Sequence, residues 1–216
     1  MTTGGSSGSS SSEGDTIRAL CARALAAVPP EGSVAAADLA KIAAWIELVE
    51  AWGKKIDLTA ARSAAELVDL MVADASVLAG AIAGDRTVVD VGSGAGAPGL
   101  PLALLRPDLR LTLVEPMQKR AALLRLAVGQ LDVADRVAIA QQRGEQLVLR
   151  FDVAISRATL PPAAWLALGA ELADEVWVLL AREPDPAHEG WRAAETLAYR
   201  WPLTDASRRA VRFVRG

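Results

Sequence analysis

Glycines and acids are spaced in one stretch of this chain as a nucleoside-binding turn would need them. The glycines follow a β-branched apolar run and are Gly92, Gly94, Gly96 and Gly99. Asp90 precedes them, and Glu115 ends the next apolar run, about 20 residues further on. A glycine-rich turn between strand and helix brings backbone N–H groups against a ligand, and an acid after the second strand can accept hydrogen bonds from a ribose diol. The pattern predicts a site for a ligand that contains a nucleoside.

The turn fits two templates, and the acid before it distinguishes them. Residues 94–99 satisfy G-x-G-x-x-G, the dinucleotide fingerprint, whereas residues 90–96 satisfy D-x-G-x-G-x-G, the first motif of S-adenosylmethionine (SAM) methyltransferases. A carboxylate at Asp90 suits the ammonium and sulfonium groups of SAM. It would sit badly beside the pyrophosphate of NAD, which needs N–H donors and no nearby negative charge. We therefore expect SAM as the cofactor, bound by Asp90, Gly92, Gly94, Gly96 and Glu115.

Strands and helices alternate from residue 87 onward, and these elements must position the turn. We expect strands at 87–91, 111–115, 136–140, 151–155 and 175–181, and helices at 98–106, 117–130 and 161–173. A helical turn is expected near Glu145, and two antiparallel strands at 196–202 and 209–215. Such alternation predicts a mostly parallel sheet covered on both faces. The fold class is therefore α/β, a Rossmann-like methyltransferase fold whose seven-stranded sheet ends in antiparallel C-terminal strands.

Polar residues follow four consecutive strands of this predicted sheet. They are Asp90 with Gly92, then Glu115, then Arg143 with Gly144 and Glu145, and finally Ser156 with Arg157. Ligands of such sheets bind outside the carboxyl ends of the strands, so these residues would meet at one edge. The alignment strengthens the prediction of a ligand site there.

The residues before the alternation are predicted to form a helical extension. Residues 1–14 are rich in glycine and serine, and we expect a disordered tail there. Helical patterns follow at 15–28 and 34–52, and Ser63 can cap a third helix that runs to Leu78. The expected organisation is a tail at 1–14, a helical extension at 15–83 and a methyltransferase core at 84–216.

Composition excludes several classes of protein. With 216 residues, of which 52% are hydrophobic, the chain can form one well-packed domain with a small extension. Cys21 is the only cysteine, so we expect no internal disulfide and no metal site, and the lone His188 falls in a loop. No apolar run reaches the ~18 residues that span a bilayer, and the N-terminus lacks signal-peptide features. We expect a cytoplasmic monomer without a membrane partner.

The distribution of charge is uneven. A formal net charge of −3 is not typical of a dedicated nucleic-acid-binding domain. The C-terminal stretch is nevertheless basic, because only Asp205 accompanies Arg200, Arg208, Arg209, Arg212 and Arg215. These arginines could form a solvated strand pair or an edge that contacts phosphates, and the sequence leaves both interpretations open.

Four segments of the chain resemble one family, RsmG, also called glucose-inhibited division protein B. They are DVGSGAGAPGLPLALLRPDL, LVEPMQKRAALLR, QRGEQL and FDVAISRA. The stretch WGKKIDLTAARSAAELVDLMVADAS is similar to that family's W-N-K-x-x-N-L-T segment and the helix after it, so the resemblance covers most of residues 40–215. This family comprises the bacterial 16S ribosomal RNA 7-methylguanosine methyltransferases. The resemblance implies SAM as cofactor, and 16S ribosomal RNA or the 30S subunit as partner.

The resemblance also assigns residues. It places Gly92 and Ala97 in the SAM loop, Gly144 and Glu145 around the adenosine, and Arg157 at the mouth shared by cofactor and substrate. Guanine N7 is a lone-pair acceptor without a proton, so methyl transfer to it needs no general base. We therefore expect no catalytic base, and we expect Arg157 to position a phosphate or the SAM carboxylate.

Three departures from the family pattern keep other functions open. The family usually has Arg-His where this chain has Leu70 and Met71, although Asp74 is kept. It usually has Leu-Lys-Gly after the fifth strand, where this chain has no lysine, and Ala97 replaces a larger apolar residue. The alternatives are a methyltransferase of the same fold that acts on a small molecule or protein, a non-catalytic SAM- or RNA-binding module, and an NAD-dependent oxidoreductase. The last would lack a Tyr-x-x-x-Lys pair.

Overall fold

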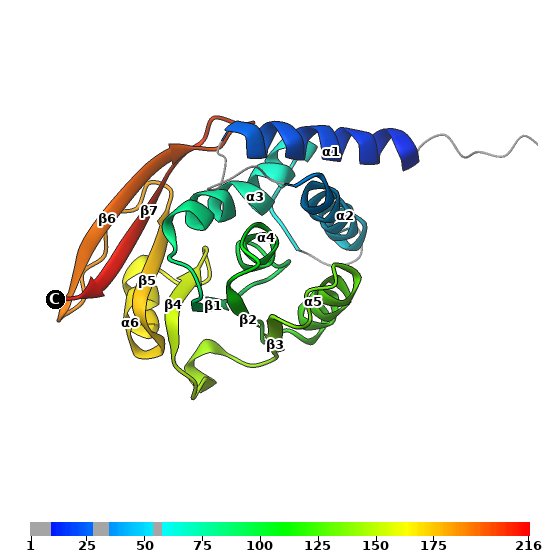
Figure 1. Ribbon diagram of the computed structural model, residues 1–216. Coiled ribbons are helices and arrows are strands. Elements are labelled where there is room, and N and C mark those ends of the chain that lie inside the picture. The colour runs from blue at the N-terminus through cyan, green and yellow to red at the C-terminus, as the bar shows by residue number, and fades with distance from the viewer. Residues whose placement is uncertain (1–9, 28–34, 54–57) are drawn as a thin grey trace, which may run out of the picture.

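One seven-stranded sheet forms the centre of the molecule (Figure 1). The computed structural model describes residues 10–27, 35–53 and 58–216, with the backbone alone for 10–15. The strands are β1 (Thr87–Val91), β2 (Arg110–Val114), β3 (Val137–Ala140), β4 (Phe151–Ser156), β5 (Ala173–Leu180), β6 (Trp191–Arg200) and β7 (Ser207–Arg215). Their order is β3-β2-β1-β4-β5-β7-β6; β1 to β5 run parallel, and β7 is antiparallel to β5 and β6. The predicted α/β fold is confirmed.

The strand order reverses at β1, which lies between β2 and β4. Asp90 of β1 pairs in register with Leu113 on one side and Ile155 on the other. Sheets of this kind bind ligands in the crevice beyond the carboxyl ends of the strands, where the order reverses. The glycine turn leaves β1 at that point.

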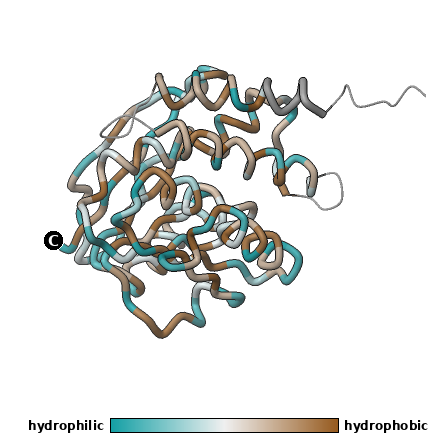
Figure 2. The backbone as a smooth tube through the Cα atoms, turned by 45° about the vertical axis from the view of Figure 1, so that its right-hand side comes forward, coloured by the Kyte–Doolittle hydropathy of each residue, from teal (hydrophilic) through white to brown (hydrophobic). Residues whose placement is uncertain are grey.

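Helices cover both faces of the sheet. They are α1 (Ser10–Ala27), α2 (Ala36–Gly53), α3 (Ala64–Ala81), α4 (Gly99–Leu105), α5 (Gln118–Gln130) and α6 (Pro162–Leu172), with a 3-10 turn η1 (Gly144–Gln146). Successive residues of β1 point to opposite faces, as the pleat of a strand requires. Val88 packs in the cluster that contains residues of α1 to α5, and Val89 packs in the cluster that contains residues of α6. Figure 2 shows hydrophobic stretches alternating with hydrophilic ones along the described chain.

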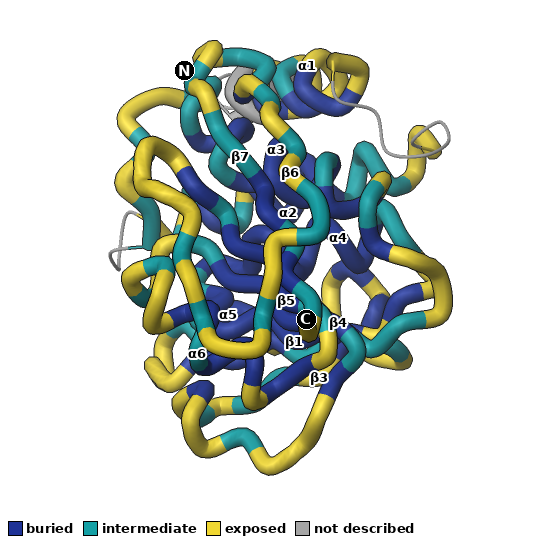
Figure 3. Tube along the Cα trace, turned by 90° about the vertical axis from the view of Figure 1, so that its left-hand side faces the viewer, coloured by how far each residue is buried: buried dark blue, intermediate teal, exposed yellow. Residues whose placement is uncertain are grey.

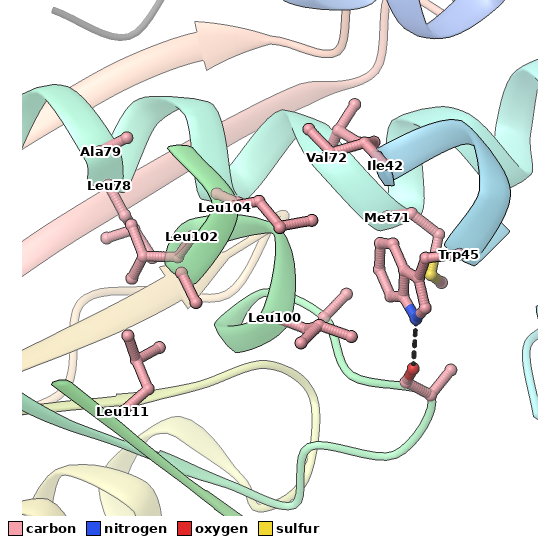
Figure 4. Close-up of a cluster of buried hydrophobic side chains, with 14 of the residues drawn as sticks. Ile42, Trp45, Met71, Val72, Leu78, Ala79, Leu100, Leu102, Leu104 and Leu111 are labelled. Carbon is pink, nitrogen blue, oxygen red and sulfur yellow. Dashed lines mark hydrogen bonds between the residues drawn. The ribbon is translucent and has the colours of Figure 1, made fainter. Parts of the chain in front are cut away.

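The helical extension and the sheet share one hydrophobic cluster. Ile17 of α1, Trp45 of α2 and Leu78 of α3 are buried in the same cluster as Leu100 of α4 and Leu113 of β2. Figure 4 shows part of it, with α4 between α3 and the sheet. Ser63 caps α3, since its side chain accepts a hydrogen bond from the Glu66 N–H, as the sequence predicts. The extension therefore packs as a layer over the site-bearing part of the fold.

Two boundaries differ by five residues from the sequence predictions, and smaller shifts occur elsewhere, such as the end of α3 at Ala81 rather than at Leu78. α1 begins at Ser10, so residues 10–14 of the predicted disordered tail are helical, while residues 1–9 lie outside the described part. β6 begins at Trp191, five residues before the predicted 196. β6 is the edge strand and has no buried residue, which Figure 3 shows, so its first half carries little apolar pattern. No helix among the described residues has the length and apolar character that a membrane crossing would require.

Candidate cofactor and acceptor site

The glycine turn is held by backbone hydrogen bonds to β2 and by a close approach to the loop after β4. The N–H groups of Gly92 and Ser93 donate to Val114 O at 2.8 and 3.1 Å. Gly92 has φ +75°, and a Cβ at this position would lie 2.2 Å from Thr159 Oγ1. Glycine is required here because both the left-handed conformation and the available space exclude a side chain.

Asp90 lies beneath the turn, with 1% of its surface exposed. Its Oδ2 accepts a hydrogen bond from the Gly99 N–H at 3.0 Å, and its Oδ1 has no partner among the described residues. Burial raises the pKa of this carboxyl to about 6, against the opposing effect of the Gly99 hydrogen bond. The free oxygen is an acceptor without a donor, which is the condition a cationic ligand would relieve.

Glu115 lies just beyond β2, with 3% exposed, and braces the other side of the turn. Its Oε2 accepts a hydrogen bond from the Gly94 N–H at 3.0 Å, and its Oε1 accepts one from the Met117 N–H at 2.9 Å. Each oxygen has a second lone pair that can accept from a ligand hydroxyl. The two acids that the sequence singles out, one in β1 and one after β2, therefore both accept hydrogen bonds from backbone N–H groups of the turn and of the helix start after it.

A cavity of about 450 Å³ opens above the turn, within the size range of small-molecule sites. It brings together five of the predicted site residues: Gly92, Gly94, Ala97, Glu115 and Arg157. The other four, Asp90, Gly96, Gly144 and Glu145, do not line it. A Cβ at Gly96 would face Leu124 and Trp45, so this glycine serves packing against the helices. Leu70 and Met71 of α3, which the sequence marks as departures, line the same cavity.

Trp45 connects the helical extension to the glycine turn. Its indole Nε1–H donates to Ala95 O at 3.2 Å, which Figure 4 shows as a dashed line. Trp45 is 1% exposed and Ala95 is also buried. Nothing in the sequence connects Trp45 with the turn, because a hydrogen bond across 50 positions leaves no local signal.

Arg157 follows β4 and points toward α3. Its guanidinium donates a hydrogen bond to Leu70 O, and its Nη1 lies 3.5 Å from Asp74 Oδ2. Asp74 is 3% exposed and also accepts hydrogen bonds from the Tyr199 hydroxyl at 2.8 Å and from the Trp201 Nε1–H at 2.9 Å. The sequence does not single out Asp74, Tyr199 or Trp201 as site residues. The one available signal is that Asp74 is kept where two nearby positions of the same helix depart from the family pattern.

The C-terminal arginines divide into two groups. Arg200 pairs with Asp205, Arg209 with Asp185, and Arg212 with Glu175 and Glu195. Arg208 instead lies over the Trp201 ring, 3.9 Å from its centroid, and Arg215 lies 5.7 Å from the centroid of Trp191. The arginines that pair with acids fit the interpretation of a solvated strand pair. Of the two that lie over tryptophan rings, Arg208 lines a cavity.

Comparison with known proteins identifies the family. Residues 38–184 match the family GidB, described as rRNA small subunit methyltransferase G. This chain belongs to that family. The ribosomal RNA small subunit methyltransferase G of Anaeromyxobacter dehalogenans strain 2CP-C is 36% identical over 195 residues, which cover 84% of this chain and 91% of the relative. The protein of the same name from Neisseria gonorrhoeae strain NCCP11945 is 36% identical over 149 residues, covering 68% and 70%.

Solved structures share the fold of this GidB family member. The protein MtNAS in complex with MTA and tNA superposes with a TM-score of 0.53 at 18% identity, over 83% of this chain and 70% of that one. A candidate RNA methyltransferase from Pyrococcus horikoshii gives a TM-score of 0.50 at 16% identity, over 65% of this chain and 79% of that one.

Among the described residues no group of three or more His, Cys, Asp or Glu is placed to hold a metal ion.

Proposed function

We propose that the protein transfers the methyl group of SAM to N7 of a guanine in the 16S ribosomal RNA of the small subunit, in the cytoplasm. The observation that carries this proposal is the match to rRNA small subunit methyltransferase G over the residues that build the cavity at the glycine turn. SAM supplies an activated methyl group, and the chain has to bind it, orient it and exclude water.

Two features of the site fit SAM. Asp90 lies beneath the turn with its Oδ1 unpartnered among the described residues; it does not line the cavity, so in this proposal its charge attracts the cationic amino-acid tail from below the turn. Gly92 and Gly94 line the cavity without side chains, so their backbone can approach a ligand closely. In this proposal Glu115 accepts from the ribose diol, and Gly92, Gly94, Gly96 and Ala97 form the turn. Gly144 and Glu145 of η1 do not line the cavity, and they are assigned to the adenine on the family resemblance alone.

The acceptor chemistry demands little of the protein. N7 of guanine attacks through its lone pair, and no proton has to be removed. The cavity lining, within the part of the chain that the structure describes, contains no histidine or cysteine. The rate enhancement would therefore come from alignment of the acceptor with the methyl group. Arg157 would position the substrate at the opening of the cavity, and its charge is balanced by Asp74.

A second candidate is a methyltransferase that acts on a small molecule or a protein. The observation that favours it is the apolar character of Leu70 and Met71 in the cavity wall, where the resemblance leads us to expect Arg-His. These side chains would not bind phosphates. The candidate retains the same cofactor site and differs only in the acceptor.

Methyl transfer from tritium-labelled SAM separates the two candidates. The protein would be incubated with 30S subunits from a strain that lacks this modification, and in parallel with a small-molecule extract and with total protein. We expect label in the ribosomal RNA, and we expect mass spectrometry of its nucleosides to find 7-methylguanosine. Label confined to the other fractions would favour the second candidate. Binding of SAM by calorimetry without label in any fraction would contradict both.

A further inference from the structure

A second cavity, of about 220 Å³, adjoins the proposed cofactor cavity. Leu70, Arg157 and Ala158 line both, so these residues form a shared wall. Sites for drug-sized ligands are about 300 Å³ or larger, so this cavity suits a smaller planar group such as one nucleobase. Its position beside the cofactor cavity is where an acceptor must sit, because the methyl group moves directly between the two.

The walls of the second cavity are fixed by Asp74. This buried acid accepts hydrogen bonds from Tyr199 and Trp201 and pairs with Arg157, so it joins α3, the end of β4 and the end of β6. Burial, followed by the nearby charge of Asp74, raises the pKa of the Tyr199 hydroxyl, which therefore stays protonated and donates. A cavity whose walls are held in this way is formed before any substrate arrives.

Arg208 supplies a positive charge at this cavity. Unlike Arg200, Arg209 and Arg212, it forms no salt bridge with an acid among the residues that the structure describes. Its Nη1 donates to Ser207 O, and its guanidinium is held against the Trp201 ring. A guanidinium fixed on an aromatic ring keeps donors free for a phosphate, at a small loss of side-chain freedom.

Glu183 supplies the complementary acceptor at the same cavity. Its Oε2 accepts from the N–H groups of Ala181 and Arg182, at 2.8 and 3.0 Å. These backbone hydrogen bonds fix the carboxylate in the loop after β5. Enzymes that act on a base hold the flipped base by its Watson–Crick edge, and guanine presents N–H donors there that a carboxylate can accept. Adenine presents an acceptor in the equivalent place.

We infer that the second cavity receives the acceptor guanine as a base flipped out of single-stranded RNA, with Arg208 on Trp201 binding an adjacent phosphate and Glu183 accepting from the base. This inference rests on the proposed function and adds the residues that select the nucleotide. Deep, narrow grooves hide N7 in RNA helices, so a flipped or looped base is the form that such a cavity can accept.

The test compares three arginine variants. Arg208→Ala removes the charge at the cavity, Arg209→Ala removes the neighbouring arginine paired with Asp185, and Arg215→Ala removes the other arginine that lies over a tryptophan. The probe is a fluorescent RNA hairpin with one guanine in its loop, matched by two hairpins with an adenine or an abasic site at that loop position. Polarisation gives the Kd at several salt concentrations, and calorimetry gives the Kd for SAM as a check of folding.

We expect Arg208→Ala to raise the Kd for the guanine hairpin about tenfold and to reduce the salt slope by about 1. Arg209→Ala and Arg215→Ala should each change that Kd less than about twofold. We expect Glu183→Gln to reduce the preference for a guanine over an adenine loop while leaving the SAM Kd unchanged.

Three results would overturn the inference. They are equal binding of guanine and abasic hairpins by the wild-type protein, an Arg208→Ala variant that matches Arg209→Ala, and a Glu183→Gln variant with unchanged preference. The proposed function fails separately, if the wild-type protein forms no 7-methylguanosine on 30S subunits. Hairpin binding needs no methyl transfer, so the two failures are distinguishable.

Discussion

Burial of the Asp90 carboxylate lowers the stability of the fold, although the same group is expected to favour cofactor binding. Its carboxylate is buried with one oxygen bonded to the Gly99 N–H and the other without a partner among the described residues, and burial costs free energy whenever the group is ionised. A nonpolar or amide side chain would remove that cost. The conflict is understandable if the free oxygen serves a cationic ligand, because then the protein tolerates the burial for binding.

The pH dependence of unfolding tests this description of Asp90. Its pKa of about 6 in the folded protein exceeds the ordinary value of 3.8, so the native state binds more protons between these values and loses stability as the pH rises through them. Asp90→Asn should lack this loss. We expect the unfolding free energy of the variant, relative to wild type, to increase by about 2–3 kcal/mol from pH 4 to pH 7.

Asp152→Asn is the matched control for this measurement. A hydrogen bond from the Thr87 hydroxyl, followed by one from the Thr87 N–H, lowers the pKa of Asp152. The sign is therefore opposite: as the pH rises through the ordinary value of 3.8 from below, this variant should lose stability relative to wild type, and above about pH 5 the difference should stay constant. Denaturant titrations at several pH values give both differences. Parallel curves for Asp90→Asn and wild type would show that folding does not raise the pKa of this carboxyl, and would contradict the description.

At the scale of elements, the glycine turn is fixed from two directions. β2 holds it through hydrogen bonds to Val114 O, and α2 holds it through the Trp45 indole. The turn therefore keeps its shape without a ligand, and both supports should contribute to SAM affinity.

Gly92→Ala tests the space within the turn. A methyl group there would strain a backbone with φ +75° and collide with Thr159, whose Oγ1 would lie 2.2 Å from the new Cβ. We expect a loss of about 1–3 kcal/mol in unfolding free energy and a weaker SAM affinity. Gly129→Ala, at a helical position with nothing within 4 Å, should stabilise the protein slightly. Equal thermal stability of the two variants would contradict the described geometry.

Trp45→Phe tests the support from α2. The variant keeps most of the apolar ring but leaves Ala95 O without its donor, so we expect a loss of about 1 kcal/mol in stability and a SAM Kd raised several-fold. Trp165→Phe removes a comparable buried hydrogen bond, from its Nε1–H to Trp177 O, away from the turn. Its SAM Kd, measured by calorimetry, should stay at the wild-type value. An unchanged SAM Kd in Trp45→Phe would show that the hydrogen bond from α2 does not contribute to cofactor binding.

The sequence predicts those elements whose signal is local. The buried parallel strands β1 to β5 alternate with helices, and their predicted starts lie within two residues of the observed ones, because each carries a dense apolar run. The predicted start of β6 is wrong, because an edge strand without buried residues has little pattern. The network around Asp74 could not be predicted, since Tyr199 and Trp201 lie 125 and 127 positions away and approach it only through the fold.

For the whole molecule, the shared core makes the extension part of one cooperative unit. Trp45 of α2 and Trp177 of β5 lie in the same hydrophobic cluster, with α4 between the extension and the sheet (Figure 4). We expect one unfolding transition, with far-ultraviolet circular dichroism and tryptophan fluorescence giving the same midpoint. Two separate midpoints would show that residues 15–83 and 84–216 fold independently.

The central claim is that SAM binds in the crevice beyond the carboxyl ends of β1 and β2. The most direct measurement is a crystal structure with S-adenosylhomocysteine, the product of methyl transfer. We predict its ribose on Glu115, its amino-acid tail at the glycine turn near Asp90, and its sulfur facing the wall formed by Leu70, Arg157 and Ala158. A bound molecule elsewhere, or a pose with the tail directed away from the turn, would contradict the account.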